Sequence, residues 1–151
     1  MGSEIGPFAV RRSIWIDATP ARVWEEFETF ERMADWYGTR HTLVQYEPAV
    51  GGRVETDAGA HENGERLRFA GAVRVFEPRR ELTFEQQWLD HSWAAPALVT
   101  IRLTPVRGGT LVELFHHGFE RLGGDPGEHL RGFENGWTMT QLEALRGRLA
   151  A

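Results

Sequence analysis

The sequence contains no cysteine and no lysine, and each absence excludes a class of chemistry. Without cysteine the chain has no disulfide, thiol nucleophile or thiolate zinc site. All 17 basic residues are arginines, which excludes Schiff-base lysines and the phosphate-binding lysine of a P-loop. Only three serines occur, and none stands in a G-x-S-x-G motif. Most covalent catalytic mechanisms therefore lack their nucleophile.

Positive charge is also scarce and dispersed. The formal net charge is −5, and the arginines are scattered along the chain. Nucleic-acid-binding proteins usually gather basic residues on one face, so we expect no nucleic-acid partner. No apolar run reaches the length of a membrane span. The N-terminus lacks the basic and apolar regions of a secretory signal, which predicts a cytoplasmic protein.

Composition predicts a globular protein. The chain has 151 residues, of which 41% are hydrophobic and 26% charged, and these values are typical of a folded core. No internal repeat or low-complexity linker interrupts it. We therefore expect one domain over residues 1–151, with its core in residues 10–149. A core of this size needs no metal or disulfide.

Hydrophobic spacing changes twice along the chain. Val10–Asp17 alternates like a strand, Thr19-Pro20 begins a helix, and a second short helix covers Glu31–Trp36. From Glu128 to Leu149 the helical period returns as one long amphipathic helix. Between them alternation predicts the strands Thr42–Glu47, Gly52–Asp57, Leu67–Phe76, Glu81–Trp88, Ala97–Thr104 and Thr110–His117.

This order predicts an α+β fold in which a seven-stranded, curved antiparallel sheet is accompanied by two short helices and a long C-terminal helix. We expect that helix to lie across the concave face of the sheet. Because a curved sheet bends away from a straight helix, the two leave a gap that suits a small ligand.

Several motifs occur in a fixed order over nearly all of residues 10–149. They are Ile14-x-Ile16-Asp17-Ala18-x-Pro20-x-Arg22-Val23-Trp24-x-x-Phe27, Trp36-Tyr37-Gly38, Gly51-Gly52-x-Val54, Gly71-x-Val73, Glu77-Pro78-x-Arg80-x-Leu82-x-Phe84, Val99-Thr100-x-x-Leu103-Thr104-Pro105, Gly108-Gly109-Thr110, His116-x-Gly118-Phe119 and Gly136-Trp137. Their order and spacing resemble the family of homologues of the activator of heat-shock-protein-90 ATPase. That family belongs to the wider superfamily of START domains, birch-pollen allergens and polyketide cyclases.

The resemblance implies the helix-grip fold, in which a curved sheet surrounds a C-terminal helix. It also implies an apolar small molecule, lipid- or polyketide-like, as the ligand of the cavity. The fold supports carriers, receptors and cyclases alike, so function must be argued from the site. A chaperone is a further partner that the family name suggests.

Strand phase identifies the side chains that face the predicted cavity. Gln86, His116 and Gln141 are polar residues on faces that should be dry, where an unpaired group costs about 1–3 kcal/mol. They bind either one another and nearby backbone, or a ligand or trapped water. The predicted ligand-binding residues are Phe69, Phe84, Gln86, Trp88, Ile101, Leu114, His116, Trp137 and Gln141.

Three functions remain open. The first is a binding protein with no cofactor, in which Gln86, His116 and Gln141 orient an apolar ligand. The second is a cyclase- or hydrolase-type enzyme with His116 as general base, although no carboxylate is expected beside it. The third is a chaperone-interacting protein. A metal site is not expected, because the neighbours His116 and His117 point to opposite faces of their strand.

Overall fold

The computed structural model describes residues 4–60 and 63–150 of the chain. The strands are β1 (Ala9–Ile16), β2 (Thr42–Tyr46), β3 (Arg53–Ala60), β4 (Arg66–Glu77), β5 (Glu81–Trp88), β6 (Ala97–Val106) and β7 (Gly109–His117). The helices are α1 (Pro20–Trp24), η1 (Glu25–Phe27), α2 (Phe30–Tyr37), η2 (Phe119–Arg121), α3 (Pro126–Glu134) and α4 (Thr140–Leu149). Each predicted strand is present, with bounds that differ by a few residues, and the α+β class is confirmed.

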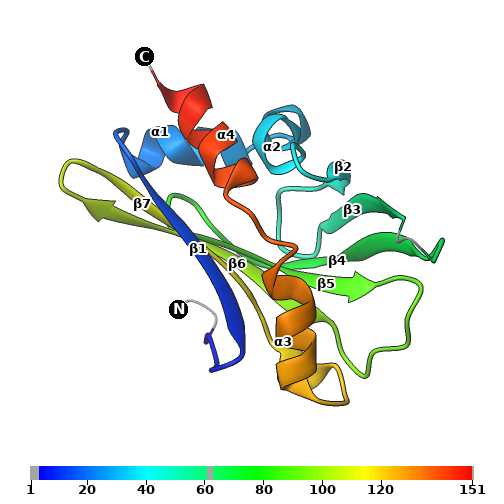
Figure 1. Cartoon of the computed structure of the whole chain (residues 1–151). Coiled ribbons are helices and arrows are strands. Elements are labelled where there is room, and N and C mark those ends of the chain that lie inside the picture. The colour runs from blue at the N-terminus through cyan, green and yellow to red at the C-terminus, as the bar shows by residue number, and fades with distance from the viewer. Residues whose placement is uncertain (1–3, 61–62, 151) are drawn as a thin grey trace.

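All seven strands form one curved antiparallel sheet (Figure 1). Its order is β1-β7-β6-β5-β4-β3-β2. The chain therefore runs as a meander from β2 to β7, and the last strand, β7, also pairs with the first strand, β1. Ile14 of β1 lies opposite Val112 of β7, and Ile101 of β6 lies opposite Leu114. These apolar pairs line the concave face, which the helices cover.

Local irregularities curve the sheet. The pairing of β4 with β5 shifts register between Val73 and Val75, and a shift of this kind bends and twists a strand. Two residues earlier, a Cβ at Gly71 would lie 2.3 Å from the carbonyl oxygen of Glu85. Only glycine allows the two backbones to approach so closely. The bend begins at the strands that form one wall of the cavity described below.

Threonines begin the two short helices, as the sequence predicts. Thr19 Oγ1 accepts a hydrogen bond from the backbone N–H of Arg22, and Pro20 takes the first helical position. Thr29 Oγ1 accepts from the N–H of Arg32 at the start of α2. Both hydroxyls satisfy donors that have no partner within the helix.

The C-terminal helix differs from the prediction. Glu128–Leu149 is not one continuous helix, because it divides into α3 and α4 with a non-helical linker over residues 135–139. Arg12 of β1 donates to the carbonyl oxygens of Glu134 (2.8 Å) and Trp137 (3.0 Å). Arg40 donates to that of Gly136 at 3.1 Å. These side chains satisfy carbonyls that the interrupted helix leaves unpaired.

The core has two parts that meet at the linker. The larger cluster packs the concave face of the sheet against α1, α2 and α4, with Trp36, Phe84 and Leu145 among its buried members. The smaller cluster lies under α3 and contains Val10 and Phe119. Trp137 packs against both clusters from the linker. Within residues 4–60 and 63–150, no helix is long and apolar enough to cross a membrane.

A buried carboxylate ties α4 to the N-terminal helices. Glu26 is 1% exposed and accepts hydrogen bonds from Arg22 (2.9 Å), Arg32 (3.2 Å) and Arg148. Arg148 also binds Asp35 of α2 at 2.9 Å. Burial raises the pKa of Glu26, but the hydrogen bonds and charges of Arg148 and Arg22 outweigh it and hold that pKa below its ordinary value.

We expect Glu26→Gln to destabilise the fold by about 1.5–3 kcal/mol at pH 7, since hydrogen bonds to a charged group are worth that much. Because folding lowers the pKa of Glu26, its stabilising effect is present at neutral pH and is lost as the pH falls through the folded-state value. Urea denaturation measures the free energy of unfolding, and the difference between wild type and Glu26→Gln should be smaller at pH 3 than at pH 7. Glu28→Gln, at an exposed neighbouring position, is the control. An equal effect of both substitutions at pH 7 would contradict the assignment.

Candidate functional site

A cavity of about 600 Å³ lies between the concave side of β3, β4 and β5 and the helix α3. Phe69 of β4 and Gln86 and Trp88 of β5 form its sheet wall. Gly132 and Phe133 of α3 face them across the space. The cavity therefore occupies the gap between curved sheet and C-terminal helix that the sequence predicts, although the helix beside it is only the first of the two segments.

Four aromatic side chains, here called the aromatic collar, line this cavity: Phe69, Trp88, Trp93 and Phe133. Each ring contacts the next, with centroid distances of 5.7 Å for Phe69–Trp88 and 6.2 Å for the three other pairs. These separations and the tilted or edge-on geometries are those that aromatic pairs prefer. The collar joins two strands, a loop and a helix into one apolar wall.

Polar groups are also found among the lining residues. Arg40, His41, His91, Glu128 and His129 all contribute to the lining. Nε2 of His129 donates to the carbonyl oxygen of Gly123 at 2.7 Å. Burial, and after it the charge of Arg40, lowers the pKa of His41. The cavity thus combines an apolar wall with a few polar groups, the usual composition of a small-molecule site.

The structure brings four of the predicted site residues to this cavity and places five elsewhere. Phe69, Gln86, Trp88 and Trp137 line it. The other five are Phe84, Ile101, Leu114, His116 and Gln141, which are buried but are not among the lining residues. Phe84, Ile101 and Leu114 lie farther along the concave face, where the helices pack directly on the sheet. His116 is bound to Trp137 of the linker, and Gln141 is a residue of α4.

His116 is enclosed by aromatic rings. Its side chain is fully buried, with ring centroids of Phe133, Phe119 and Trp137 at 4.7, 4.8 and 5.8 Å. Trp137 Nε1 donates to Nδ1 of His116 at 2.9 Å, so the neutral ring carries its proton on Nε2. Nε2 and the buried Oε1 of Gln141 have no hydrogen-bond partner among the described residues. Burial lowers the pKa of His116 to about 3.

His117 points to the other side of the sheet, as expected of a neighbouring strand residue. Its Nε2 lies 2.8 Å from Thr100 Oγ1, which lies 2.9 Å from Thr83 Oγ1. Thr83 donates its only hydroxyl proton to Glu81, so Thr100 donates to Thr83, and His117 must donate to Thr100 through Nε2–H. Burial lowers the pKa of His117 to about 4. This chain of bonds accounts for four buried polar residues.

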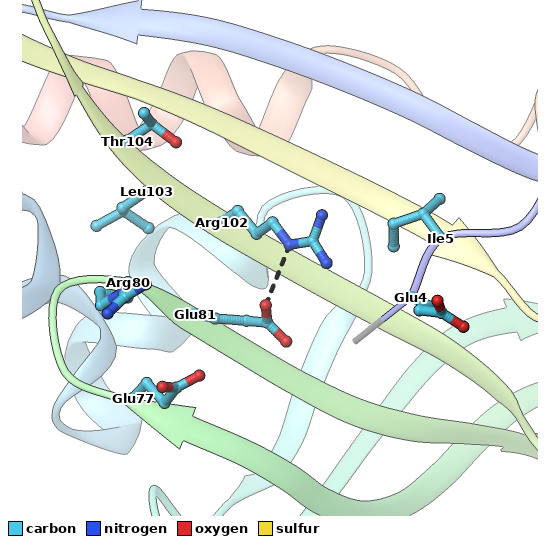
Figure 2. Close-up of a pocket in the computed structure, with 8 residues that line it drawn as sticks. All are labelled: Glu4, Ile5, Glu77, Arg80, Glu81, Arg102, Leu103 and Thr104. Carbon is cyan, nitrogen blue, oxygen red and sulfur yellow. Dashed lines mark hydrogen bonds and ion pairs between the residues drawn. The ribbon is translucent and has the colours of Figure 1, made fainter. Parts of the chain in front are cut away.

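Beside this series of hydrogen bonds, the convex face of the sheet has a second hollow of about 500 Å³. Figure 2 shows the residues that line it. Glu81 and Arg102, two of its lining residues, form an ion pair with Nε 3.1 Å from Oε1. Glu4, Glu77 and Arg80 add further charge. An apolar molecule would have to desolvate these groups. The cavity on the concave side is therefore the better candidate for the ligand predicted from the sequence.

Several cavity residues were not predicted. Tyr37, Arg40 and Thr56 reach the cavity from α2, from the turn after it and from β3. Trp93 comes from the loop between β5 and β6. Its contacts with Trp88 and Phe133 make it part of the wall. No group of three or more metal-binding side chains occurs in the parts of the chain that the structure describes.

The fold is that of a curved-sheet α+β domain, and comparison of the sequence with known families identifies the family to which it belongs. Residues 17–150 match the family described as activator of Hsp90 ATPase homolog 1-like protein. The chain belongs to this family. No curated protein sequence matches the chain.

Solved structures share the fold. Protein MLL2253 from Mesorhizobium loti has a TM-score of 0.68 and 22% identity, over 93% of this chain and 96% of that one. DynU16, from the dynemicin biosynthetic locus, has a TM-score of 0.68 and 22% identity. The match covers 95% of this chain and 48% of DynU16. CalU16 from Micromonospora echinospora has a TM-score of 0.64 and 20% identity, over 94% of this chain and 78% of that one. The family and the curved sheet fit a ligand-binding domain.

The environment of His116 leads to a pH prediction. Because burial lowers its folded-state pKa to about 3, the unfolded chain binds a proton at this ring below about pH 6.5 and the folded chain does not. Stability should therefore fall as the pH drops from about 6.5 towards 3. In NMR titrations the ring signals of His116 should stay those of a neutral imidazole from pH 8 to pH 4.5.

His116→Asn removes the titrating ring, and its amide oxygen replaces Nδ1 as an acceptor for Trp137. We expect the variant to lose stability at pH 7, since the smaller side chain leaves a void, but to depend less on pH between 6.5 and 3. Urea denaturation at several pH values measures both effects. A ring of His116 that titrates near pH 6.5 in the folded protein would contradict the assignment.

Proposed function

We propose that the protein binds an apolar small molecule in the cavity between β3–β5 and α3. The observation that carries this proposal is the aromatic collar, which lines a space of about 600 Å³. Cavities of roughly 300–1,000 Å³ with apolar walls and a few polar groups are typical of sites for small molecules. Each large ring offers contact area, and an edge-on or stacked aromatic contact adds about 0.5–1.5 kcal/mol.

The polar lining indicates how the ligand is oriented. Gln86 is 8% exposed, and its amide is both a donor and an acceptor on the sheet wall. Thr56 of β3 adds a hydroxyl, and Arg40 adds a cation. An apolar molecule that carries a carbonyl, hydroxyl or acidic group satisfies these side chains while its remaining surface contacts the collar. Lipid- or polyketide-like compounds have this composition.

The solved relatives are consistent with this proposal. DynU16 comes from a biosynthetic locus, and the enzymes and carriers of such loci handle small molecules. His116, the base of an enzymatic alternative, is enclosed behind Trp137, whereas the collar contacts any molecule in the cavity. A binding function therefore needs only side chains that line the cavity, whereas a reaction at His116 needs a ring that is enclosed.

A chaperone is a second candidate partner, and only the family description favours it. Its test is the ATPase rate of an Hsp90-type chaperone with and without the purified protein. If the ATPase rate increases equally with the wild type and with a variant whose cavity is filled by a substitution, the effect belongs to another surface of the molecule.

The cavity itself is tested by filling it from α3. Gly132 lines the cavity, and a Cβ added there meets no atom within 4 Å. Gly132→Phe should therefore place a ring in the ligand space without disturbing the helix, and replacing a helix glycine removes a destabilising residue. We expect the affinity for anilinonaphthalene sulfonate, measured by fluorescence titration, to fall about tenfold or more while the melting temperature stays or rises.

Gly147→Phe is the matched control. Gly147 lies within α4, where an added Cβ also meets open space, but it does not line the cavity. The control should bind the dye as the wild type does. Equal dye affinity of the wild type and Gly132→Phe would show that the ligand binds elsewhere. As a separate measurement, native mass spectrometry of gently purified wild type and Gly132→Phe would identify any ligand that is retained by the wild type and not by the variant.

A further inference from the structure

His91 lines the cavity and has a carboxylate partner. Its Nε2 lies 2.8 Å from Oε2 of Glu65, and both side chains are about one-third exposed, at 37% and 35%. Glu65 is not among the lining residues, so this carboxylate contacts His91 from outside the lining of the cavity. The sequence suggested His116 as a base without a carboxylate beside it. The structure places such a pair at His91 instead.

The hydrogen bond defines which nitrogen of His91 is basic. A carboxylate only accepts hydrogen bonds, so Nε2 of His91 carries the proton that it shares with Glu65. In the neutral ring the lone pair is then on Nδ1. The same arrangement, a carboxylate on one ring nitrogen and a lone pair on the other, orients the histidine of hydrolytic triads and stabilises the imidazolium that forms.

A second contact favours the cation. The ring of His91 lies over Trp88, with centroids 3.8 Å apart and planes inclined by 31°. An imidazolium on the face of an indole is stabilised by the negative charge density of the ring. Glu65 and Trp88 therefore both stabilise His91 after it accepts a proton. Trp88 also belongs to the aromatic collar, so this base is attached to the binding wall itself.

The surrounding backbone holds the pair in place. Trp88 Nε1 donates to the carbonyl oxygen of Arg66 at 2.9 Å, which fixes the indole. The N–H of His91 donates to the carbonyl of Trp88, and Gln87 Nε2 donates to the carbonyl of His91 at 3.2 Å. Asp90, next to His91, is paired with Arg68 at 3.1 Å. Side chains held in this way lose little freedom when a substrate binds.

We propose that His91, positioned by Glu65, is a general base that removes a proton from a carbon acid held in the cavity. The substrate class is an apolar molecule with a C–H bond beside a carbonyl. The C–H bond breaks, its electron pair moves onto the carbonyl oxygen as an enolate, and the proton goes to Nδ1 of His91. The enolate then re-forms its carbonyl and takes the proton back from the imidazolium at a conjugated carbon or on its other face, so the net reaction is an isomerisation without oxidant or reductant.

The proposal rests on binding in the cavity, and nitrobenzisoxazole tests both steps. A base removes the ring C–H proton of this flat apolar probe, the electron pair forms the nitrile, and the N–O bond breaks to release a coloured cyanophenolate. Binding is measured by displacement of anilinonaphthalene sulfonate, and turnover by absorbance. We expect saturable turnover, with kcat about 100-fold lower in His91→Gln, the lower end of what a positioned base contributes.

The variants separate a base from a structural contact. Gln at position 91 keeps an N–H donor for Glu65, so a role in holding the loop survives while the base is lost. Glu65→Gln keeps an acceptor but loses the charge that stabilises the imidazolium, so kcat should fall while KM stays. Glu113→Gln, whose carboxylate pairs with Arg11 away from the cavity, should leave both unchanged.

Two results overturn the proposal and are distinguishable. If the probe displaces the dye but its turnover is equal in wild type and His91→Gln, His91 is not a base and the binding function stands. If the probe neither displaces the dye nor turns over, and Gly132→Phe leaves dye binding unchanged, both the base and the binding function fail.

Discussion

The cavity depends on the hydrogen bonds by which Arg12 holds the carbonyls of Glu134 and Trp137. A single helix over the 22 positions from Glu128 to Leu149 would be a rod about 33 Å long. The break lets α3 and α4 take different directions. α4 packs against α2 and the closed part of the core, whereas α3 lies over the other end of the sheet with a space beneath it. The contacts of Arg12 and Arg40 with the linker thus lie between the closely packed part of the concave side and the part that contains the cavity.

Arginine is the only strong cation in this sequence, and its geometry suits the contacts that it makes. Arg12 binds two carbonyls, Arg148 bridges Glu26 and Asp35, and Arg40 binds the carbonyl of Gly136. A planar fork of five N–H donors serves two acceptors at once, which a lysine does with less precision. The break and the C-terminal end of this segment are therefore both fixed to the N-terminal third of the chain by arginine side chains.

Strand positions could be predicted because alternation and turn residues are local signals. The helix break could not, because the apolar spacing of Phe133, Trp137 and Leu142 continues across it, while the arginine that binds the freed carbonyls is far away in β1. Strand phase likewise predicts a face but not a position along it. Gln86 and Phe84 share the concave face of β5, yet only Gln86 reaches the cavity. Which part of the face stays open depends on where the helices pack.

Two histidines that each contact one ring of the aromatic collar show why burial alone does not make a base. His116 is completely enclosed, and its pKa of about 3 means that accepting a proton is costly across the neutral range. A catalytic base must accept a proton readily and then release it. His91 keeps water on one side, an indole face on another and a carboxylate at Nε2. A histidine at the edge of the cavity therefore keeps contact with solvent and with a carboxylate, whereas a histidine in the driest part of the core keeps neither.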